Sequence, residues 1–411
     1  MVKVKPYLLL FLRVGVLSAI FTMASWTYDV SKTMMRTFWE RPDSFTVDTL
    51  NLHWNTTFPG ITVCQVFNGE RNWELNEKYY GEDRDKRLDD FIIDITYFSG
   101  TCYSCELCQQ DLDCPKNFSE LLSKFRSICE NMITNCTWNE IDFDCCKMFL
   151  PLETEFGICY TINSRNTKPS ASNILASNRK TGPGHLKFAL LEDVQIFIHP
   201  PNEVPHAFQD REIKQTVLWG SKKDIILKTE DIIDPEKASV SCYKPKDFSL
   251  YETYTSSTCA IACHIEAQIF YCNCTHHFMP HSENDKFAIC TFEGLMCLTQ
   301  HFADISKHRK ECKCAPSCES IMLTTVQELE EEQASELGSI IKISQMQLST
   351  LRYIKRSTKS ILSFIISFGG LIGLIYGISF LSMVEYFELL LTFFSKKIRS
   401  FFCVFIKKKK K

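Results

Sequence analysis

The sequence predicts an α+β membrane protein in which two transmembrane helices flank a large, disulfide-rich extracellular domain. Three observations in the 411 residues carry this prediction. An apolar segment without a charged side chain runs from Ile361 to Val384, and a shorter one runs from Tyr7 to Ala24. Between them, from Cys64 to Cys318, lie twenty of the 21 cysteines. Dense cysteine of this kind is typical of disulfides formed in an oxidising compartment.

The C-terminal apolar segment is long enough to span a bilayer. At the rise of an α-helix, residues 361–384 cover about 36 Å, against roughly 30 Å for the hydrocarbon core. Four glycines and several serines interrupt the segment, and Glu385 and Glu388 follow it. These features favour a pore-lining helix, although small residues that only let helices pack remain an alternative.

The N-terminal apolar segment has two possible interpretations. Eighteen residues with Arg13 among them make a weak membrane span, and the same pattern describes a cleaved signal peptide. If the segment is retained, Lys3, Lys5 and the basic C-terminal tail place both termini in the cytoplasm. The resulting division is a short cytoplasmic N-terminus at 1–6, transmembrane helix 1 at 7–27, the extracellular domain at 28–359, transmembrane helix 2 at 360–392 and a basic cytoplasmic tail at 393–411.

Charge and glycosylation signals agree with that topology. The net charge of −3 hides eight basic residues after Glu388, which leave 38 basic against 49 acidic residues in the rest of the chain. Four N-x-S/T sequons lie in the cysteine-rich region, at Asn55, Asn117, Asn135 and Asn273. We therefore expect a glycosylated, acidic body outside the cell.

Several elements of the extracellular region can be predicted in order. Phe58–Cys64 follows a Pro-Gly turn and predicts a short strand, and residues 186–200 predict two strands. The interval 164–184 is rich in turn-forming residues and predicts a loop. Cys259 and Cys263 are four residues apart on one face of a predicted helix, and residues 340–348 predict a strand that leads back to the membrane.

Zinc binding is the competing interpretation of the cysteines. Cys102, Cys105 and Cys108 have ligand-like spacing, and so does a second group made of Cys272, Cys274, His276 and His277. An oxidising compartment favours disulfides, so we expect no metal. The two histidines could instead sense protons. No Walker loop, G-x-S-x-G, H-E-x-x-H or nucleic-acid motif is present in the sequence, and we expect no enzyme.

Four motifs together resemble one family. They are FPGITVC at 58–64, GICYTIN at 157–163, CKCAPSC at 312–318 and GGLIGLIYGISFLSMVE at 369–385. The sequence resembles the degenerin and epithelial sodium channel superfamily, and most of all its arthropod pickpocket-type members. The resemblance implies a β-rich extracellular domain of the palm, finger and thumb type.

The resemblance also implies the function and the partners. It implies a plasma-membrane subunit of a homo- or hetero-trimer with related subunits, which conducts cations, prefers sodium and is often blocked by amiloride. The other partners would be membrane lipid and an unknown extracellular stimulus or ligand. No cofactor is implied besides the permeant Na⁺.

The resemblance assigns roles along the second helix. Gly377, Ile378 and Ser379 match the selectivity filter, where unwound carbonyls and a hydroxyl are hard oxygen ligands for sodium. Glu385 and Glu388 match acidic positions of the inner vestibule. The gate region would comprise Ile366, Ser367, Gly369 and Gly370, and we expect the large Ile366 to bias the pore open.

The resemblance further implies seven disulfides, since the spacing of the last ten extracellular cysteines alone leaves their pairing open. They are Cys242–Cys318, Cys259–Cys314, Cys263–Cys312, Cys272–Cys297, Cys274–Cys290, Cys64–Cys159 and Cys136–Cys145. Six cysteines stay without an assigned partner, namely Cys102, Cys105, Cys108, Cys114, Cys129 and Cys146.

Two alternatives to a conducting channel remain at the level of sequence. One is a single-span, cysteine-rich cell-surface receptor or adhesion protein with a cleaved N-terminal signal. The other is a non-conducting modulatory subunit. Only six residues precede the first apolar segment, so the family's cytoplasmic His-Gly gating motif does not occur in this sequence, and we expect a truncation or altered gating. ATP-gated trimers share the two-span plan but fit the cysteines poorly.

Overall fold

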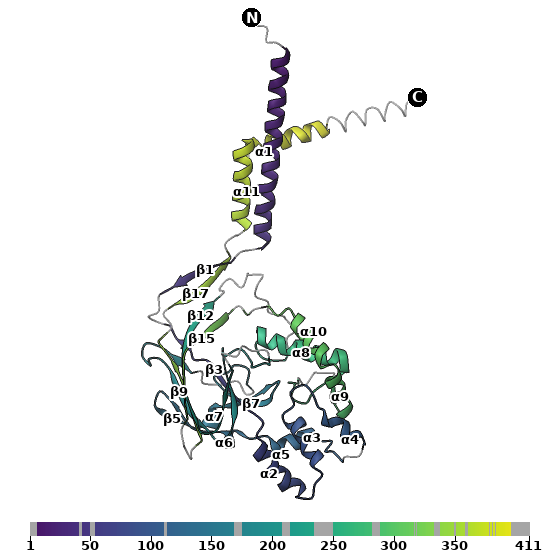
Figure 1. Ribbon diagram of the computed structural model, residues 1–411. Coiled ribbons are helices and arrows are strands. Elements are labelled where there is room, and N and C mark those ends of the chain that lie inside the picture. The colour runs from purple at the N-terminus through teal and green to yellow at the C-terminus, as the bar shows by residue number, and fades with distance from the viewer. Residues whose placement is uncertain are drawn as a thin grey trace. The chain divides into compact units, whose positions relative to one another are not determined.

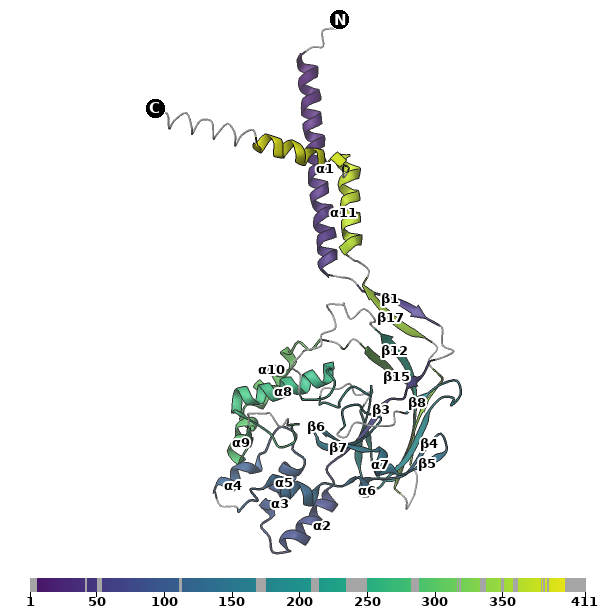
Figure 2. The ribbon, with the colours of Figure 1, turned by 180° about the vertical axis from the view of Figure 1, so that it is seen from behind.

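The structure is a computed structural model. It describes residues 6–40, 43–49, 54–110, 113–167, 175–207, 214–233, 250–281, 288–315, 317, 319–332, 338–348, 351–357, 361–377, 379, 381–382 and 384–395. The chain divides into two compact units. We call Met1–Ser44 with Arg356–Lys411 the terminal unit and Phe45–Lys355 the central unit (Figures 1 and 2).

The terminal unit is helical. Helix α1 runs from Pro6 to Glu40, α11 from Ile361 to Tyr376, and residues 384–395 form a further helical segment. Helices α1 and α11 lie side by side (Figure 1), with the rings of Phe38 and Phe364 4.6 Å apart and the Tyr376 hydroxyl donating to Thr27 Oγ1 at 3.3 Å. Within the described residues, the structure contains no helix that is both long enough and apolar enough to cross a membrane.

The larger sheet of the central unit has eight strands. Strand β12 is paired along one edge with β15 and along the other with β16 and β17. The order along the sheet is β1 (Asp43–Asp48), β17 (Arg352–Ser357), β12 (Ser221–Ile233), β16 (Ser339–Gln345), β9 (His185–Leu190), β4 (Ile133–Trp138) and β5 (Ile141–Phe143), with β15 (Glu319–Glu332) on the free edge of β12.

A second sheet of five strands packs against the first. Its order is β11 (Lys214–Val217), β10 (Val194–His199), β3 (Gly60–Gln65), β7 (Gly157–Ile162) and β6 (Leu150–Thr154). Val63 and Ile196 of this sheet belong to the same fully buried apolar cluster as Phe188, Ile341 and Ile343 of the larger sheet. Two short ladders pair β2 (Thr56–Thr57) with β8 (Ala176–Ser177) and β13 (Cys274–Thr275) with β14 (Ala288–Ile289).

Most helices of the central unit gather on one side of the sheets (Figures 1 and 2). They are α2 (Gly69–Tyr80), α3 (Lys86–Thr96), the 3-10 helix η2 (Ser104–Glu106), α4 (Leu107–Gln110), α5 (Phe118–Phe125), α8 (Ser256–Cys272), α9 (Phe292–Gln300) and α10 (Phe302–Glu311), while α6 (Cys129–Met132) and α7 (Cys145–Met148) lie beside the sheets. The buried side chains of the helices on that one side form a second apolar cluster that includes Phe91, Phe125 and Leu295.

Residues at its two ends explain where helix α8 begins and ends. Thr255 caps α8 in a capping box with Thr258, and Asn273 ends the helix in the left-handed conformation. Helix α8 contains the predicted pair Cys259 and Cys263. The predicted strands are also present as β3, β9, β10 and β16, and the described part of the interval 164–184 is irregular apart from the two-residue β8.

The structure contains six of the seven disulfides that the resemblance implies. These are Cys64–Cys159, Cys136–Cys145, Cys259–Cys314, Cys263–Cys312, Cys272–Cys297 and Cys274–Cys290. Cys242 and Cys318 lie outside the described residues. The cysteines left unassigned form Cys102–Cys105, Cys108–Cys114 and Cys129–Cys146. All five cysteines of the two groups with zinc-like spacing are therefore oxidised.

Candidate functional site

The predicted filter coincides with an interruption of the C-terminal helix. Helix α11 ends at Tyr376, and Gly377 has a φ of +64°. The Gly377 N–H donates to the Gly373 carbonyl at 2.9 Å, which closes the last turn. Because side chains with a Cβ rarely adopt this left-handed conformation, glycine is suited to end the helix here.

Ser379 lies on the other side of the interruption. Its hydroxyl oxygen accepts from the Ser382 N–H at 3.2 Å and lies 3.0 Å from the Ser382 hydroxyl, as expected for a residue that caps the following helix. The last carbonyls of a helix have no intrahelical N–H partner. A left-handed glycine followed by a serine cap is thus the kind of helix break at which backbone oxygens can lack an intrahelical partner. Ile378 lies outside the described residues.

The other predicted pore residues flank this interruption. Ile366, Ser367, Gly369 and Gly370 lie on α11, and Glu385 and Glu388 lie on the helical segment that follows. All six are exposed in the single chain, and a Cβ added at Gly369 or Gly370 would meet no atom within 4 Å. Their roles in gating and permeation stay predictions.

A second candidate site is a cavity in the central unit of about 690 Å³. Its walls come from the end of β3, the segment after α3, the turn between β6 and β7, helix α8 and helix α10. It is lined by rings, cations and imidazoles, and one carboxylate, Glu155, is among the lining residues. The sheets and the helices therefore meet around a space that has both charged and aromatic walls.

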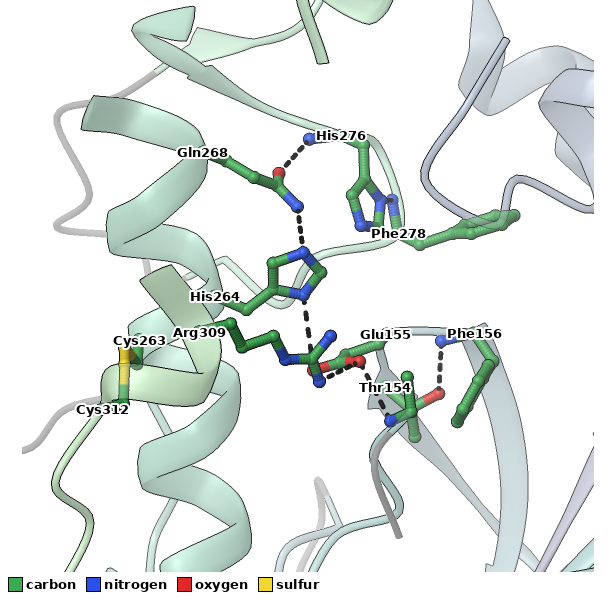
Figure 3. Close-up of polar contacts among 11 residues, drawn as sticks. Thr154, Glu155, Phe156, Cys263, His264, Gln268, His276, Phe278, Arg309 and Cys312 are labelled. Atoms are coloured by element: carbon green, nitrogen blue, oxygen red, sulfur yellow. Dashed lines mark hydrogen bonds and ion pairs between the residues drawn. A yellow bond between two sulfur atoms is a disulfide. The ribbon is translucent and has the colours of Figure 1, made fainter. Parts of the chain in front are cut away.

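Glu155 is buried and has several partners. Arg309 Nη2 donates to both its carboxylate oxygens, at 2.5 and 2.8 Å, and the Ala207 N–H donates at 3.2 Å. His264 Nδ1 lies 3.5 Å from Glu155 Oε1 (Figure 3). Burial alone raises the pKa of Glu155, but the hydrogen bond and charge of His264 together with Arg309 lower it to about 2. The carboxylate is ionised throughout the physiological range.

A chain of hydrogen bonds continues from Glu155 along α8. Gln268 Oε1 accepts from the His276 N–H at 3.0 Å, so its amide nitrogen faces His264 Nε2, also at 3.0 Å (Figure 3). This arrangement assigns the proton of a neutral His264 to Nδ1, toward Glu155. Residues of β6–β7, α8 and α10 are thereby joined through side chains.

Of the histidines proposed as proton sensors, His276 is buried and His277 is half-buried. Burial lowers the pKa of His276 well below its usual value, and nearby histidines lower it further. Burial also lowers the pKa of His277 to about 4, although its Nε2 lies 2.8 Å from the Ile95 carbonyl. Both side chains are therefore neutral at pH 7.

Arg126 also lines the cavity, but its partners differ from those of Arg309. Its Nη2 donates to the Phe156 carbonyl at 2.9 Å and Nη1 to the Thr96 carbonyl at 3.5 Å. The guanidinium carbon also lies 5.4 and 5.8 Å from the ring centroids of Phe278 and Tyr97. Burial lowers the pKa of Arg126. Among the described residues, its contacts are carbonyl dipoles and ring faces rather than a carboxylate.

No motif in the sequence indicates this cavity. Glu155 and Arg309 are separated by 154 residues, and Arg126 belongs to no motif. An acidic residue two positions before the GICYTIN motif was the available signal, but its partner lies on α10. The four sequon asparagines predicted as glycosylation sites, Asn55, Asn117, Asn135 and Asn273, are all exposed.

Comparisons with known proteins concern nearly the whole chain. A family profile described as amiloride-sensitive sodium channel matches residues 11–389. "Sodium channel protein Nach" of Drosophila ananassae is 22% identical over 229 residues, which cover 49% of this chain and 42% of that protein. "Pickpocket protein 11" of Drosophila melanogaster is 24% identical over 355 residues, 80% of this chain and 61% of that protein. The chain thus spans about half the length of these relatives.

A solved structure, "Cryo-EM structure of a proton-activated chloride channel", aligns over 92% of this chain and 98% of that chain. The TM-score is 0.33 and the sequence identity is 4%.

Proposed function

The chain belongs to the amiloride-sensitive sodium channel family, and from this membership we propose that it is a subunit of a trimeric, sodium-preferring cation channel, sensitive to amiloride and gated through its central unit. The interruption of the C-terminal helix at Gly377 and Ser379 carries the proposal. Backbone oxygens freed at such a break can replace the hydration shell of a small cation.

The proposal places the two apolar segments, 7–27 and 360–392, in the plasma membrane with both termini in the cytoplasm. Three copies of the C-terminal helix would then surround the pore, with Gly377 to Ser379 at the filter. Glu385 and Glu388 would form carboxylate rings below it that concentrate cations. Gly377, Ser379, Glu385 and Glu388 are exposed in the single chain, which is compatible with contacts to water or to other subunits.

Gating would be transmitted along the strands that lead to the pore helix. Strand β16 pairs with β12 in the large sheet. Strand β17 also pairs with β12 and is the last strand before α11 in the chain. A change in the central unit that shifts this sheet would move the start of α11. The large side chain of Ile366 would hinder close approach of the three helices and favour the open state.

Recording currents from cells that express the chain tests the proposal. We expect an inward current that disappears when external sodium is replaced by N-methyl-D-glucamine and that falls when amiloride is applied. If the chain alone is silent, co-expression with a related subunit should restore the current. Silence in both settings, with the protein at the cell surface, would favour the modulatory alternative. A mature N-terminus near Ser25 would contradict the two-span topology.

Ser379→Ala sharpens the test. The variant removes the hydroxyl that caps the second helical segment, and we expect a reduced preference for sodium over potassium, read as a shift of the reversal potential. Ser395→Ala is the matched control, since Ser395 donates to the Thr392 carbonyl on the same helical segment, away from the interruption. An unchanged reversal potential in Ser379→Ala would contradict the assignment of the filter.

A further inference from the structure

We propose that the cavity beside Glu155 binds a small organic anion with an aromatic body, its acidic group at Arg126 and its body between the lining rings. The proposal goes beyond ion conduction and does not depend on it. Three observations support it, namely the charge of the lining, the incomplete partners of Arg126 and the apolar surface of the mouth.

The charges that line the cavity do not balance. The cationic side chains Arg126, Arg309 and Lys310 line it together with one carboxylate, Glu155. That carboxylate is fully engaged, because Arg309 binds both of its oxygens and His264 and the Ala207 N–H complete its surroundings. Glu155 and Arg309 thus neutralise one another, which leaves an excess of positive charge facing the space.

Arg126 is the cation that a ligand would complete. A guanidinium has five N–H donors in a planar fork that matches a carboxylate. Two donors of Arg126 are used by the carbonyls of Phe156 and Thr96. Glu192, a carboxylate that acts on Arg126 through space, is itself held by Arg71 at 3.0 Å and by Ser127 at 3.0 Å. Among the described residues no carboxylate contacts Arg126 directly, and a bound anion would give this partly desolvated charge such a contact.

The rest of the lining suits an aromatic body. Tyr97, Phe98 and Phe278 contribute ring surface to the wall, and Phe67 and Phe302 are 49% and 45% exposed. Phe302 is held close to the backbone at Gly100, where an added Cβ would come within 2.6 Å of the ring. A volume of about 690 Å³ lies within the range of cavities that hold small organic ligands.

The position of the cavity gives binding a structural consequence. Its walls come from both the five-stranded sheet and helices α8 and α10, which are joined here by the Glu155–Arg309 pair. A ligand between Arg126 and Phe302 would add a second connection, from the residue that directly follows α5 to the start of α10. Bound ligand should therefore stabilise the folded central unit.

The test compares three probes of one shape. The full chain, purified in detergent, is titrated in a calorimeter with 4-phenylbutyrate, its neutral amide and 4-phenylbutylamine, and empty micelles serve as blanks. Charge-assisted hydrogen bonds to a guanidinium are worth enough for an affinity ratio of about tenfold. We expect the acid to bind about tenfold or more tightly than the amide and the amine not to bind.

Variants assign the binding to the cavity. Arg126→Gln should weaken the acid about tenfold and leave the amide unchanged. Lys310→Gln should weaken the acid by a smaller factor, while the matched control Lys307→Gln, an exposed lysine of the same helix outside the lining, should not. Phe302→Ala should weaken acid and amide by the same factor.

Three results would overturn the proposal. They are equal binding of acid and amide, tighter binding of the amine, which would indicate a cation site at Glu155, and an unchanged affinity of the acid in Arg126→Gln. If Arg126→Gln does not fold, Lys310→Gln and Phe302→Ala decide, because both side chains are exposed. Unchanged binding of the acid in both would also refute the site. No current is measured, so failure here leaves the channel proposal unaffected.

Discussion

In the central unit, we call the two sheets the sheet half and helices α2–α5 and α8–α10 the helix half. The contacts that stabilise the two halves differ in kind. Between the two sheets, fully buried apolar side chains such as Phe188, Ile196 and Ile341 form one continuous cluster. Among the described residues, six of the nine disulfides lie in the helix half, and Glu155 and Arg309 link that half to the sheets. Apolar burial depends little on pH or ligands, whereas charge pairs and cavities respond to both. The contacts that link the helix half to the sheets are therefore expected to respond more to pH or to a ligand than the apolar cluster between the sheets does.

The largest expected effect comes from removing the charge of Glu155. Glu155→Gln leaves Arg309 as a buried cation without its carboxylate, and breaking a buried pair in this way costs about 3–5 kcal/mol of unfolding free energy. Urea unfolding of the full chain, followed by tryptophan fluorescence, measures the change.

Glu153→Gln is the matched control for this substitution. Glu153 is exposed and lies on β6, the strand that ends directly before Glu155, so its charge contributes within about 0.5 kcal/mol. Adding Arg309→Met to Glu155→Gln should recover part of the loss, because the unpaired cation is removed as well. If Glu155→Gln unfolds at the same urea concentration as Glu153→Gln, the link between the two halves is not made by this pair.

Mild acid should weaken the stability contributed by buried neutral histidines before it weakens that of the Glu155–Arg309 ion pair. Burial lowers the pKa of His277 and of His199 to about 4, whereas an unfolded histidine titrates near 6.5. Below pH 6.5 the unfolded chain binds more protons, so the stability contributed by each neutral, buried histidine is complete above pH 6.5 and is lost as pH falls toward 4. At pH 5 the loss is about 2 kcal/mol for each histidine.

The Glu155–Arg309 pair should survive the same acid. The pKa of Glu155 is lowered to about 2, so its contribution is complete above about pH 4.5 and is lost only as pH falls toward 2. Thermal unfolding at pH 7.5 and pH 5 tests this order. His277→Gln in the helix half and His199→Gln in the sheet half should each reduce the shift between the two pH values. His301→Gln, at an exposed position of the helix half, should not reduce it.

Short-range signals explain how much of this architecture could be predicted. The strand at 60–65 follows a Pro-Gly turn, and the two strands at 185–199 alternate or carry β-branched residues. The helix at 256–272 begins at a threonine cap and places two cysteines one turn apart. Each of these elements is specified by residues within itself or beside it.

The longest strand pair was not predicted, because its stability is not local. Strand β15 contains ELEEE, which has low β-propensity in isolation. Lys223 on β12 lies 3.2 Å from Glu330 and 3.6 Å from Glu328, and Lys222 lies 2.8 Å from Glu331. The acidic run is thus stabilised by lysines about a hundred residues earlier in the sequence. The cavity could not be predicted for the same reason, since its lining residues are distant in the sequence and come together only after folding.

The smallest expected effect tests whether charged contacts contribute little to the stability of the sheet half. Arg352 of β17 donates to Asp231 of β12 at 2.9 and 3.3 Å, and its guanidinium carbon lies 4.4 Å from the ring centroid of Trp54. Lysine keeps the charge but loses the planar stacking and the two-nitrogen contact. Arg352→Lys should therefore cost about 1 kcal/mol, well below the effect of Glu155→Gln.

Arg87→Lys provides the comparison for this last variant, since Arg87 pairs with Asp85 at 2.6 Å with both side chains exposed, and we expect a change of about 0.5 kcal/mol or less. The same urea unfolding measures both variants. A loss in Arg352→Lys as large as that in Glu155→Gln would mean that the sheet half also depends on a charged contact. The difference between the two halves would then lie in the position of their charges, at the sheet edge or beside the cavity, rather than in the kind of force.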